Sequence, residues 1–381
     1  MLTSTLVIVT IVIITALAFD FTNGFHDSAN AMATSVATGA LKPRVAVLIA
    51  AVLNVAGAFM STEVAKTISS GMVDDTLVTP VMVFAGLSGA ILWNLLTWLL
   101  GMPSSSSHAL FGGLIGAVLV SAGVAGIHPD VIVSKILLPA LAAPIIAGIA
   151  AAVATRLAYR IAPKAESGSA GIFRHGQTIS ASLVALAHGT SDGQKTMGII
   201  TLVLVAGGFQ ASGTGPQMWV IIAAGLAIGL GTYSGGWRIM RTLGKGLVDI
   251  KAPQGFAAET ATTAAILASS HLGFGLSTTH VASGSIMGSG VGRDASAVRW
   301  GVAGRMVITW LVTLPAAALV GAAAAALTML GTVGVGLALA LLIAGVVTVM
   351  VIASRNKVTA DNVHDHHEVA VTSSPAAPSH A

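Results

Sequence analysis

The sequence predicts an all-α polytopic membrane protein built from two inverted-topology repeats, with broken helices, Ser/Thr-rich hairpin loops and about 10–12 membrane segments. Three observations support this fold class. Of the 381 residues, 55% are hydrophobic and only 8% are charged, and the mean hydropathy is +0.88. Two pairs of polar motifs recur inside apolar segments at nearly the same offset. The basic residues change sides between equivalent loops of the two halves.

The composition excludes a soluble domain, because soluble proteins carry about one quarter charged residues. The chain has no cysteine, which excludes disulfides, thiolate chemistry and cysteine metal sites. Its net charge of +4 lies in short loops, so we expect the lipid bilayer and not nucleic acid as a partner. Segment 2–20 lacks a basic n-region and an A-x-A-like cleavage site, so we expect a retained span and not a signal peptide.

The polar motifs form two pairs. NGFHDSAN at 23–30 matches HGTSDGQK at 188–195, and GMPSSSSHALFGGLIG from Gly101 matches GFGLSTTHVASGSIMG from Gly273. The aspartates of the first pair lie 165 positions apart, and the histidines of the second pair 172. Offsets that agree this closely indicate a duplicated unit. Transporters with internal repeats place the substrate where such Gly-interrupted polar segments meet.

The apolar segments follow one another at 2–20, 45–62, 80–100, 108–125, 136–158, 178–206, 216–236, 252–272, 281–291, 300–325 and 331–353. Two longer stretches, 2–41 and 179–205, exceed one straight span and are polar in the middle. Gly and polar residues within a span are tolerated where the backbone is buried or lines a cavity. We therefore expect helix breaks at Asn23-Gly24 and at His188-Gly189, supported by Asn23 and His188.

The domain boundaries follow from these segments and from the charges. We expect a first repeat at 1–158, a central cytoplasmic loop at 159–177, a second repeat at 178–353 and a disordered polar tail at 354–381. Loop 42–44 has two basic residues and its equivalent 207–217 has none, whereas segment 61–75 has one and its equivalent 237–251 has four. The positive-inside rule then requires two halves of opposite orientation. It places the basic loops and the tail in the cytoplasm.

The second pair of motifs starts two Gly-spaced helices with PSSSSH at 103–108 and LSTTH at 276–280. Ser and Thr at a helix start satisfy free backbone N–H groups. A run of them offers hydroxyl donors, backbone N–H groups and the positive end of the helix dipole together. Two such ends would surround a small tetrahedral oxyanion. The alternative is that these residues only cap kinked helices.

Asp27 and Asp192 lie where a carboxylate costs several kcal/mol unless it is paired or hydrated. Two carboxylates also repel a bound anion, so cations must accompany it. Lys195, one turn from Asp192, supplies one charge, and the rest must arrive as protons, Na⁺ or a divalent metal such as Mg²⁺. No permanently bound cofactor is expected. The alternative is a closed structural Asp192–Lys195 ion pair, which leaves Asp27, beside neutral Asn30, unexplained.

Histidines of the motifs are candidates for a proton relay, because imidazole titrates near neutral pH. The candidates are His26, His108 and His280, with Glu259 as an extension. The alternative for each histidine is a hydrogen-bonded helix contact.

NGFHDSANAMAT (23–34), AHGTSDGQKTMG (187–198) and the two Ser/Thr-His loops resemble the inorganic phosphate transporter (PiT) family, specifically its bacterial low-affinity branch. The resemblance spans about residues 15–350. It implies secondary uptake of inorganic phosphate coupled to H⁺ or Na⁺ in the bacterial inner membrane, as a neutral metal–phosphate complex. By matching position, it implies phosphate binding by Asn30, Ser105, Ser106, Ser107, Lys195, Thr278 and Thr279. It assigns the accompanying cation or metal to Asp27 and Asp192.

The chain departs from the family pattern in the second half. The usual Asn-Asp pair is Ser191-Asp192 here, which puts the coordination beside Asp192 in doubt. Lys195 stands where the family often has Asn, and its charge disfavours Na⁺. We therefore expect protons in preference to sodium.

Other functions remain open at this point. Sulfate is also tetrahedral, but phosphate can be protonated near neutral pH and so can donate to a carboxylate. An intramembrane hydrolase would need one oriented nucleophile–base pair, which duplicated loops do not favour. A passive channel would suit a continuous pore better than buried charges at a repeat interface. The sequence leaves the oligomeric state open, with a homodimer among the alternatives, and we predict no enzymatic activity.

Overall fold

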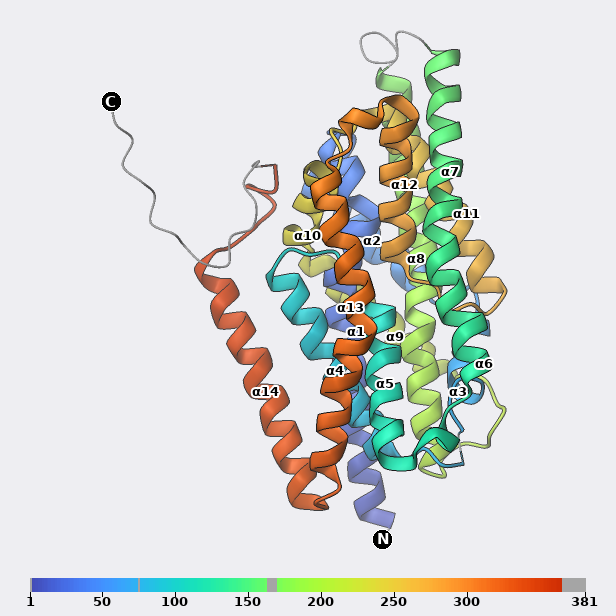
Figure 1. The fold of residues 1–381 in the computed structure, drawn as a ribbon, viewed down its shortest axis with the longest axis vertical. Coiled ribbons are helices and arrows are strands. Elements are labelled where there is room, and N and C mark those ends of the chain that lie inside the picture. Colours follow the sequence, from blue (N-terminus) through green and yellow to red (C-terminus); the bar gives the residue numbers. More distant parts are fainter. Residues whose placement is uncertain (1, 75, 163–169, 365–381) are drawn as a thin grey trace.

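The computed structural model describes residues 2–74, 76–162 and 170–364, and their regular structure is helical (Figure 1). Within these ranges the β-structure consists of two isolated antiparallel bridges, Val73 with Ile127 and Val248 with Val298. The two bridges join equivalent positions of the two halves. The all-α fold class is therefore confirmed.

The first half contains α1 (Leu2–Ala37), α2 (Pro43–Gly57), α3 (Glu63–Ser70), α4 (Pro80–Leu99), α5 (Ser106–Ala122), η1 (Val124–Gly126), α6 (Pro129–Ile132), η2 (Val133–Leu137) and α7 (Leu138–Ile161). The second half contains α8 (Ala170–Ala206), α9 (Met218–Ser234), α10 (Trp237–Arg241), η3 (Thr242–Gly246), α11 (Ala252–His271), α12 (Thr278–Arg293), η4 (Ala295–Ala297), α13 (Trp300–Thr328) and α14 (Thr332–Arg355). The two series are similar but not identical, because the π-helical turn η2 comes before α7 in the first half and η3 comes before α11 in the second, where α14 follows as an additional helix.

Five helical stretches are long and apolar enough to cross a membrane, namely 5–37, 80–99, 129–161, 300–328 and 332–355. A sixth span results if α9 and the segment 237–246 are taken together, although they are bent by 59°. The protein is therefore a multi-pass membrane protein. These spans are fewer than the 10–12 segments expected, because α2 and α5 are short and because α8 and α11 carry more polar residues.

The expected helix breaks at Asn23-Gly24 and His188-Gly189 are wrong, because α1 and α8 run through both positions without interruption. The two glycines have another role. A Cβ on Gly24 would lie 2.3 Å from the carbonyl oxygen of Ile228 in α9, and one on Gly189 would lie 2.2 Å from that of Asn54 in α2. Glycine thus allows two helix backbones to touch, and the bend of the chain lies instead between α9 and α10.

The two halves interleave through these close contacts. α1 packs on α9 and α8 packs on α2 through the glycines just described. In the same way, a Cβ on Gly116 of α5 would lie 2.0 Å from the carbonyl oxygen of Ala318 in α13, and one on Gly288 of α12 would lie 2.0 Å from that of Gly148 in α7. α1 and α5 of the first half therefore pack on α9 and α13 of the second, and α8 and α12 of the second half pack on α2 and α7 of the first.

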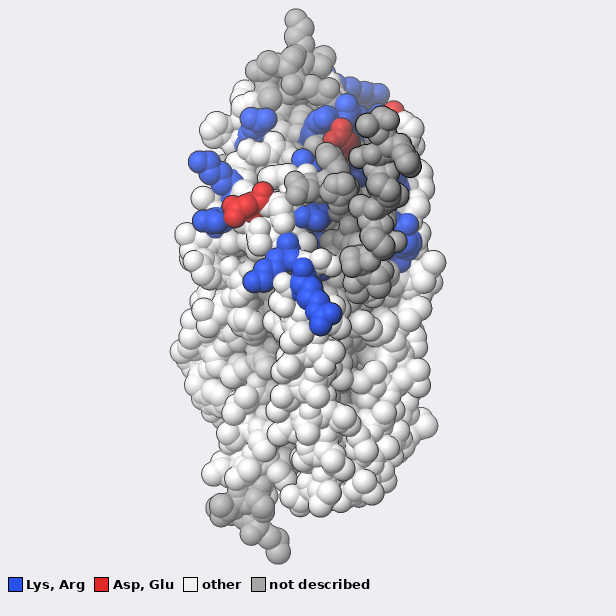
Figure 2. All heavy atoms as spheres, turned by 90° about the vertical axis from the view of Figure 1, so that its left-hand side faces the viewer, with Lys and Arg blue, Asp and Glu red and all other residues white. Residues whose placement is uncertain are grey.

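α1 and α8 run in opposite directions. In Figure 1 α1 starts at the lower end of the molecule, whereas α8 starts at the upper end, next to the end of α7. Figure 2 shows Lys and Arg side chains gathered over the upper half of one face, while the lower half of that face carries none. The long axis of the molecule thus has a basic end and an uncharged end on this face.

The expected central loop and tail are only partly described. Within 159–177, α7 continues to Ile161 and α8 begins at Ala170, and residues 163–169 lie outside the described residues. The expected disorder of the tail falls largely on 365–381, which also lie outside them. The described part of the tail packs on the second half, because Arg241 donates a hydrogen bond of 2.6 Å to the carbonyl oxygen of Asn362.

Candidate functional site

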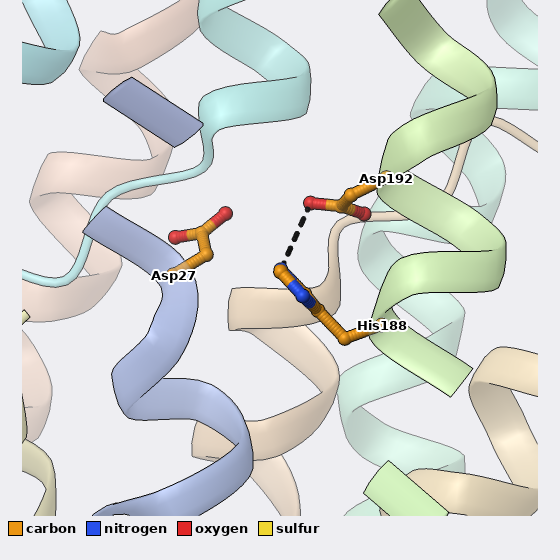
Figure 3. Close-up of side chains that lie close together, drawn as sticks. All are labelled: Asp27, His188 and Asp192. Carbon is orange, nitrogen blue, oxygen red and sulfur yellow. Dashed lines mark ion pairs between the residues drawn. The ribbon is translucent and has the colours of Figure 1, made fainter. Parts of the chain in front are cut away.

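The two aspartates of the paired motifs meet in the interior of the bundle (Figure 3). Asp27 on α1 is 1% exposed and Asp192 on α8 is fully buried. One ligand atom each from Asp27, His188 and Asp192 lie within 4.8 Å of one another, and Figure 3 shows the three side chains pointing toward a common centre. The convergence of both motifs on one buried point is the central feature of the site.

Asp27 is held by donors from three helices. Its Oδ1 lies 2.6 Å from Nδ1 of His26 and accepts a hydrogen bond of 3.1 Å from the hydroxyl of Thr279. Its Oδ2 accepts a hydrogen bond of 2.5 Å from the hydroxyl of Ser106. The starts of α5 and α12 therefore both contact the carboxylate of α1.

Asp192 is paired with the buried ammonium group of Lys195. Lys195, 1% exposed, contacts Oδ1 of Asp192 and donates a 2.6 Å hydrogen bond to the hydroxyl of Ser107. Oδ2 of Asp192 receives longer contacts from the amide of Asn23 at 3.3 Å and from the hydroxyl of Thr278 at 3.4 Å. Lys195 thus links the acid of α8 to the start of α5.

The hydroxyl groups at the starts of α5 and α12 have matching roles. Ser105 and Ser277 cap α5 and α12 by accepting from the backbone N–H groups of the histidines three residues later. The two hydroxyls that follow each cap turn toward the charged groups, one to Asp27 and the other to the Asp192–Lys195 pair. Asn30 completes this arrangement by donating a 2.9 Å hydrogen bond to the hydroxyl of Thr279.

The predicted site residues therefore gather at one point with three exceptions. Ser105 lies at the start of α5, but its hydroxyl is taken up by the N–H group and ring of His108. The rings of His108 and His280 stack at 4.9 Å and lie beside Trp310. They line an apolar cavity of about 490 Å³ whose wall includes the exposed Leu141. Among the described contacts neither ring reaches Asp27 or Asp192, so the geometry does not support a relay through them.

His26 and His188 do lie at the site. His26 contacts Asp27 directly, and its other ring nitrogen lies 3.3 Å from the hydroxyl of Ser104. His188 supports no helix break, since its Nε2 lies 3.4 Å from Asp192 and its Nδ1 lies 3.1 Å from the amide oxygen of Asn54. Both imidazoles thus adjoin a carboxylate.

Sequence reasoning missed two residues and left a third undecided. Asn54 was overlooked, although an amide in an otherwise apolar helix was the available signal, and it bridges His188 and Thr232 with a 2.7 Å bond to the latter. Asp20, one further acid on α1, is fully buried and belongs to neither motif. Glu259 is 3% exposed and accepts hydrogen bonds from Thr34, Ser35, Gln177 and Ser180.

The sequence of the chain is similar to a family of known proteins. A family model described as the phosphate transporter family matches residues 23–169 and 160–321. A probable low-affinity inorganic phosphate transporter of Mycobacterium bovis is 59% identical over 314 residues, which cover 82% of this chain and 75% of that protein. The protein of the same description in Mycobacterium leprae is 52% identical over 366 residues, covering 95% of this chain and 88% of that protein.

More distant relatives share the description or the fold. A probable low-affinity inorganic phosphate transporter of Bacillus subtilis is 42% identical over 324 residues, or 84% of this chain and 96% of that protein. A solved structure entitled "The sodium-dependent phosphate transporter" has the same fold, with a TM-score of 0.76 and 24% identity over 85% of this chain and 100% of that chain. The relatives are named as transporters, which confirms that the chain is no enzyme. The chain belongs to the phosphate transporter family.

Proposed function

We propose that the chain imports inorganic phosphate by cation symport, as a secondary active transporter in which protons are favoured over sodium. The observation that carries this proposal is the meeting of Asp27, Asp192 and Lys195 with four hydroxyls from the starts of α5 and α12. Donors, one cation and two acids at one buried point suit an anion that travels with positive charge. The family of the chain supplies phosphate as the substrate.

Six side chains would hold the phosphate. The amide of Asn30 and the hydroxyls now donate to an aspartate, to a hydroxyl or, for Ser107, to the carbonyl oxygen of Leu276. Each of these donors can turn to an oxyanion, and Lys195 adds a charge-assisted hydrogen bond. The residues are Asn30, Ser106, Ser107, Lys195, Thr278 and Thr279. Ser105 would contribute by starting α5 and not through its hydroxyl, because that group caps the helix.

The charges of the site require accompanying cations. Asp27, Asp192 and Lys195 sum to a single negative charge, to which phosphate adds its own. At an effective dielectric constant of 20, two unit charges 4 Å apart interact by about 4 kcal/mol. A protonated phosphate, a divalent metal bound to it, or both would remove this repulsion. Asp27, His188 and Asp192 offer two carboxylate oxygens and one imidazole nitrogen to such a metal.

Protons fit the second half of the site better than sodium. The ammonium group of Lys195 already neutralises Asp192, so a sodium ion there would meet a like charge. Asp27 is bound to His26, a side chain that can carry a proton itself. Both contacts favour coupling through proton binding.

The arrangement also supports two inverted repeats in a bacterial inner membrane, with the basic end and the tail in the cytoplasm. The support is the opposite direction of α1 and α8, the reciprocal helix packing and the basic residues over the upper half of Figure 2. Reporters inserted after Gly213 and after Asp249 should respond from opposite sides of the membrane. Reporters that respond from the same side would contradict the inversion.

Uptake into proteoliposomes tests the function. We expect phosphate to accumulate when an inward proton gradient is imposed, more strongly with Mg²⁺ present, and not with a sodium gradient alone. Arsenate should compete and sulfate should not, because sulfate cannot donate a proton to the aspartates. Uptake that is blocked by sulfate but not by arsenate would favour a sulfate symporter. Ohmic anion currents without accumulation would favour a channel.

A further inference from the structure

Asp20 lies on α1, one turn before Asn23 and two turns before Asp27, and is 0% exposed. Neither oxygen of its carboxyl group has a hydrogen-bond partner among the described residues, and Asp20 takes part in none of their ion pairs. A buried carboxylate without a donor or a cation is unfavourable, so this group needs a ligand. Nothing in the phosphate site described above uses it.

Two neighbouring side chains are short of partners in the same place. Thr196 on α8 and Asn23 on α1 lie beside the carboxyl group of Asp20. The hydroxyl of Thr196 and the amide oxygen of Asn23 also lack hydrogen-bond partners among the described residues. The contact with Asp192 identifies which end of the Asn23 amide is the nitrogen. The group that faces Oδ2 of Asp192 must be a donor, because a carboxylate oxygen can only accept. Four buried oxygen atoms thus share one region and have too few donors.

The charged groups that face Asp20 are Asp192 and Lys195, both from α8. The ammonium group of Lys195 is already bound to Asp192 and Ser107. α4 and α9, which also pack on α1, contain no Asp, Glu, His, Lys or Arg. α10 and η3 also pack on α1 and carry Arg238, Arg241 and Lys245, but none of these is among the charged groups that face Asp20. Among the described residues Asp20 therefore has no cation of its own.

We propose that Asp20 is a proton-binding site of this transporter and that its proton is held between the carboxyl group and the side chains of Asn23 and Thr196. The inference rests on the proposed symport function. One proton satisfies all four oxygens. The carboxyl O–H donates to the amide oxygen of Asn23, and the hydroxyl of Thr196 donates to the other carboxyl oxygen.

The same amide connects the proton to the substrate site. When Asp20 releases its proton, its carboxylate faces the amide oxygen of Asn23, and two acceptors repel each other. Rotation of the amide then brings its N–H group to Asp20 and withdraws it from Asp192. Asp192 holds Lys195, which contacts Ser107 at the start of α5. The proton is taken from water on one side of the membrane and returned to water on the other.

The full-length chain in proteoliposomes provides the test, with Asp20→Asn compared with the wild type. Asp130→Asn is the control, because Asp130 is an exposed acid at the start of α6. Phosphate exchange at equal pH on both sides reports the proposed function. Accumulation under an inward gradient of one pH unit reports coupling, and it rises about tenfold for each proton that travels with phosphate.

We expect the Asp20→Asn variant to exchange phosphate at equal pH but to accumulate about tenfold less phosphate than the wild type under the pH gradient. The Asp20→Glu variant and the Asp130→Asn control should both accumulate phosphate as the wild type does. Full accumulation by Asp20→Asn would overturn the proposal. So would accumulation that a sodium gradient drives in the wild type and that Asp20→Asn abolishes, because Asp20 would then bind sodium.

An infrared difference measurement decides proton binding without transport. The carbonyl band of a protonated carboxyl group should be present in the wild type and absent from Asp20→Asn at the same pH. Identical bands in the wild type and in Asp20→Asn would overturn the proposal. If the wild type shows this band but does not exchange phosphate, the result would contradict the proposed transport function and not the proton site. If Asp20→Asn does not reach the membrane, Thr196→Val should shift the pH dependence of exchange, and an unchanged profile would overturn the proposal.

Discussion

Replacing Lys195 by Met removes the ammonium group and keeps a side chain of similar length. Asp192 then keeps three longer contacts, with the amide of Asn23 at 3.3 Å and with the hydroxyl of Thr278 and Nε2 of His188 at 3.4 Å each. These long contacts do not neutralise a buried carboxylate, and breaking a buried ion pair from one side destabilises by about 3–5 kcal/mol. We therefore expect Lys195→Met to lower the free energy of unfolding by an amount in this range.

The double variant Lys195→Met/Asp192→Asn separates structure from function. Replacing both members of a buried ion pair by neutral groups is often neutral for stability, so the free energy of unfolding should return close to that of the wild type. Phosphate affinity should not return, because the lost charge-assisted hydrogen bond contributes about 1.5–3 kcal/mol. That range corresponds to roughly 10- to 150-fold weaker binding.

Thermal unfolding in detergent, followed by tryptophan fluorescence, measures the stability of the three variants Lys195→Met, Asp192→Asn and the double variant. Titration calorimetry with phosphate measures the affinity, and uptake into proteoliposomes measures transport. Near-normal transport by the double variant would refute the reasoning, because Asp192 and Lys195 would then form a closed structural pair. A stability that stays as low as in Lys195→Met would show that the pair is not the cause of the loss.

Three further predictions concern other parts of the site. Asp27→Asn should abolish coupled uptake while the protein stays in the membrane, and near-normal uptake would show that this carboxylate is not central. Thr279→Ala should weaken phosphate binding by about 1 kcal/mol, or roughly fivefold, without loss of expression; unchanged affinity in calorimetry would contradict the contact. Gly189→Ala should destabilise by about 1–3 kcal/mol, since its Cβ would lie 2.2 Å from the carbonyl oxygen of Asn54. Gly304→Ala is its control, because no atom lies within 4 Å there, and equal unfolding temperatures of the two variants would contradict the packing.

The motifs predicted the site because their chemistry is unusual for their surroundings. Asp27 and Asp192 are costly within apolar helices, and their equivalent positions suggested one shared site. The structure brings them together from α1 and α8. The hydroxyls of Ser106 and Thr279 donate hydrogen bonds to Asp27, and their runs start helices in both halves.

Asp20 and Asn54 were not predicted, because each occurs in one half and so lacks the repetition that marked the other residues. The roles of His108 and His280 depended on which way their rings turn, and the rings turn away from the acids to stack on each other. Gly24 was read as a helix break, but its function is set by a partner more than 200 positions away in the chain, Ile228.

The sequence by itself determined the membrane class and predicted the duplication and the types of groups proposed to meet the substrate, because hydropathy, spacing and charge are local properties of the chain. Only the tertiary structure decided that α1 and α8 remain unbroken and that Lys195 binds both Asp192 and Ser107. The physical reason is that a glycine can serve a bend or a close contact equally well. Which of the two applies depends on the backbone that packs against it.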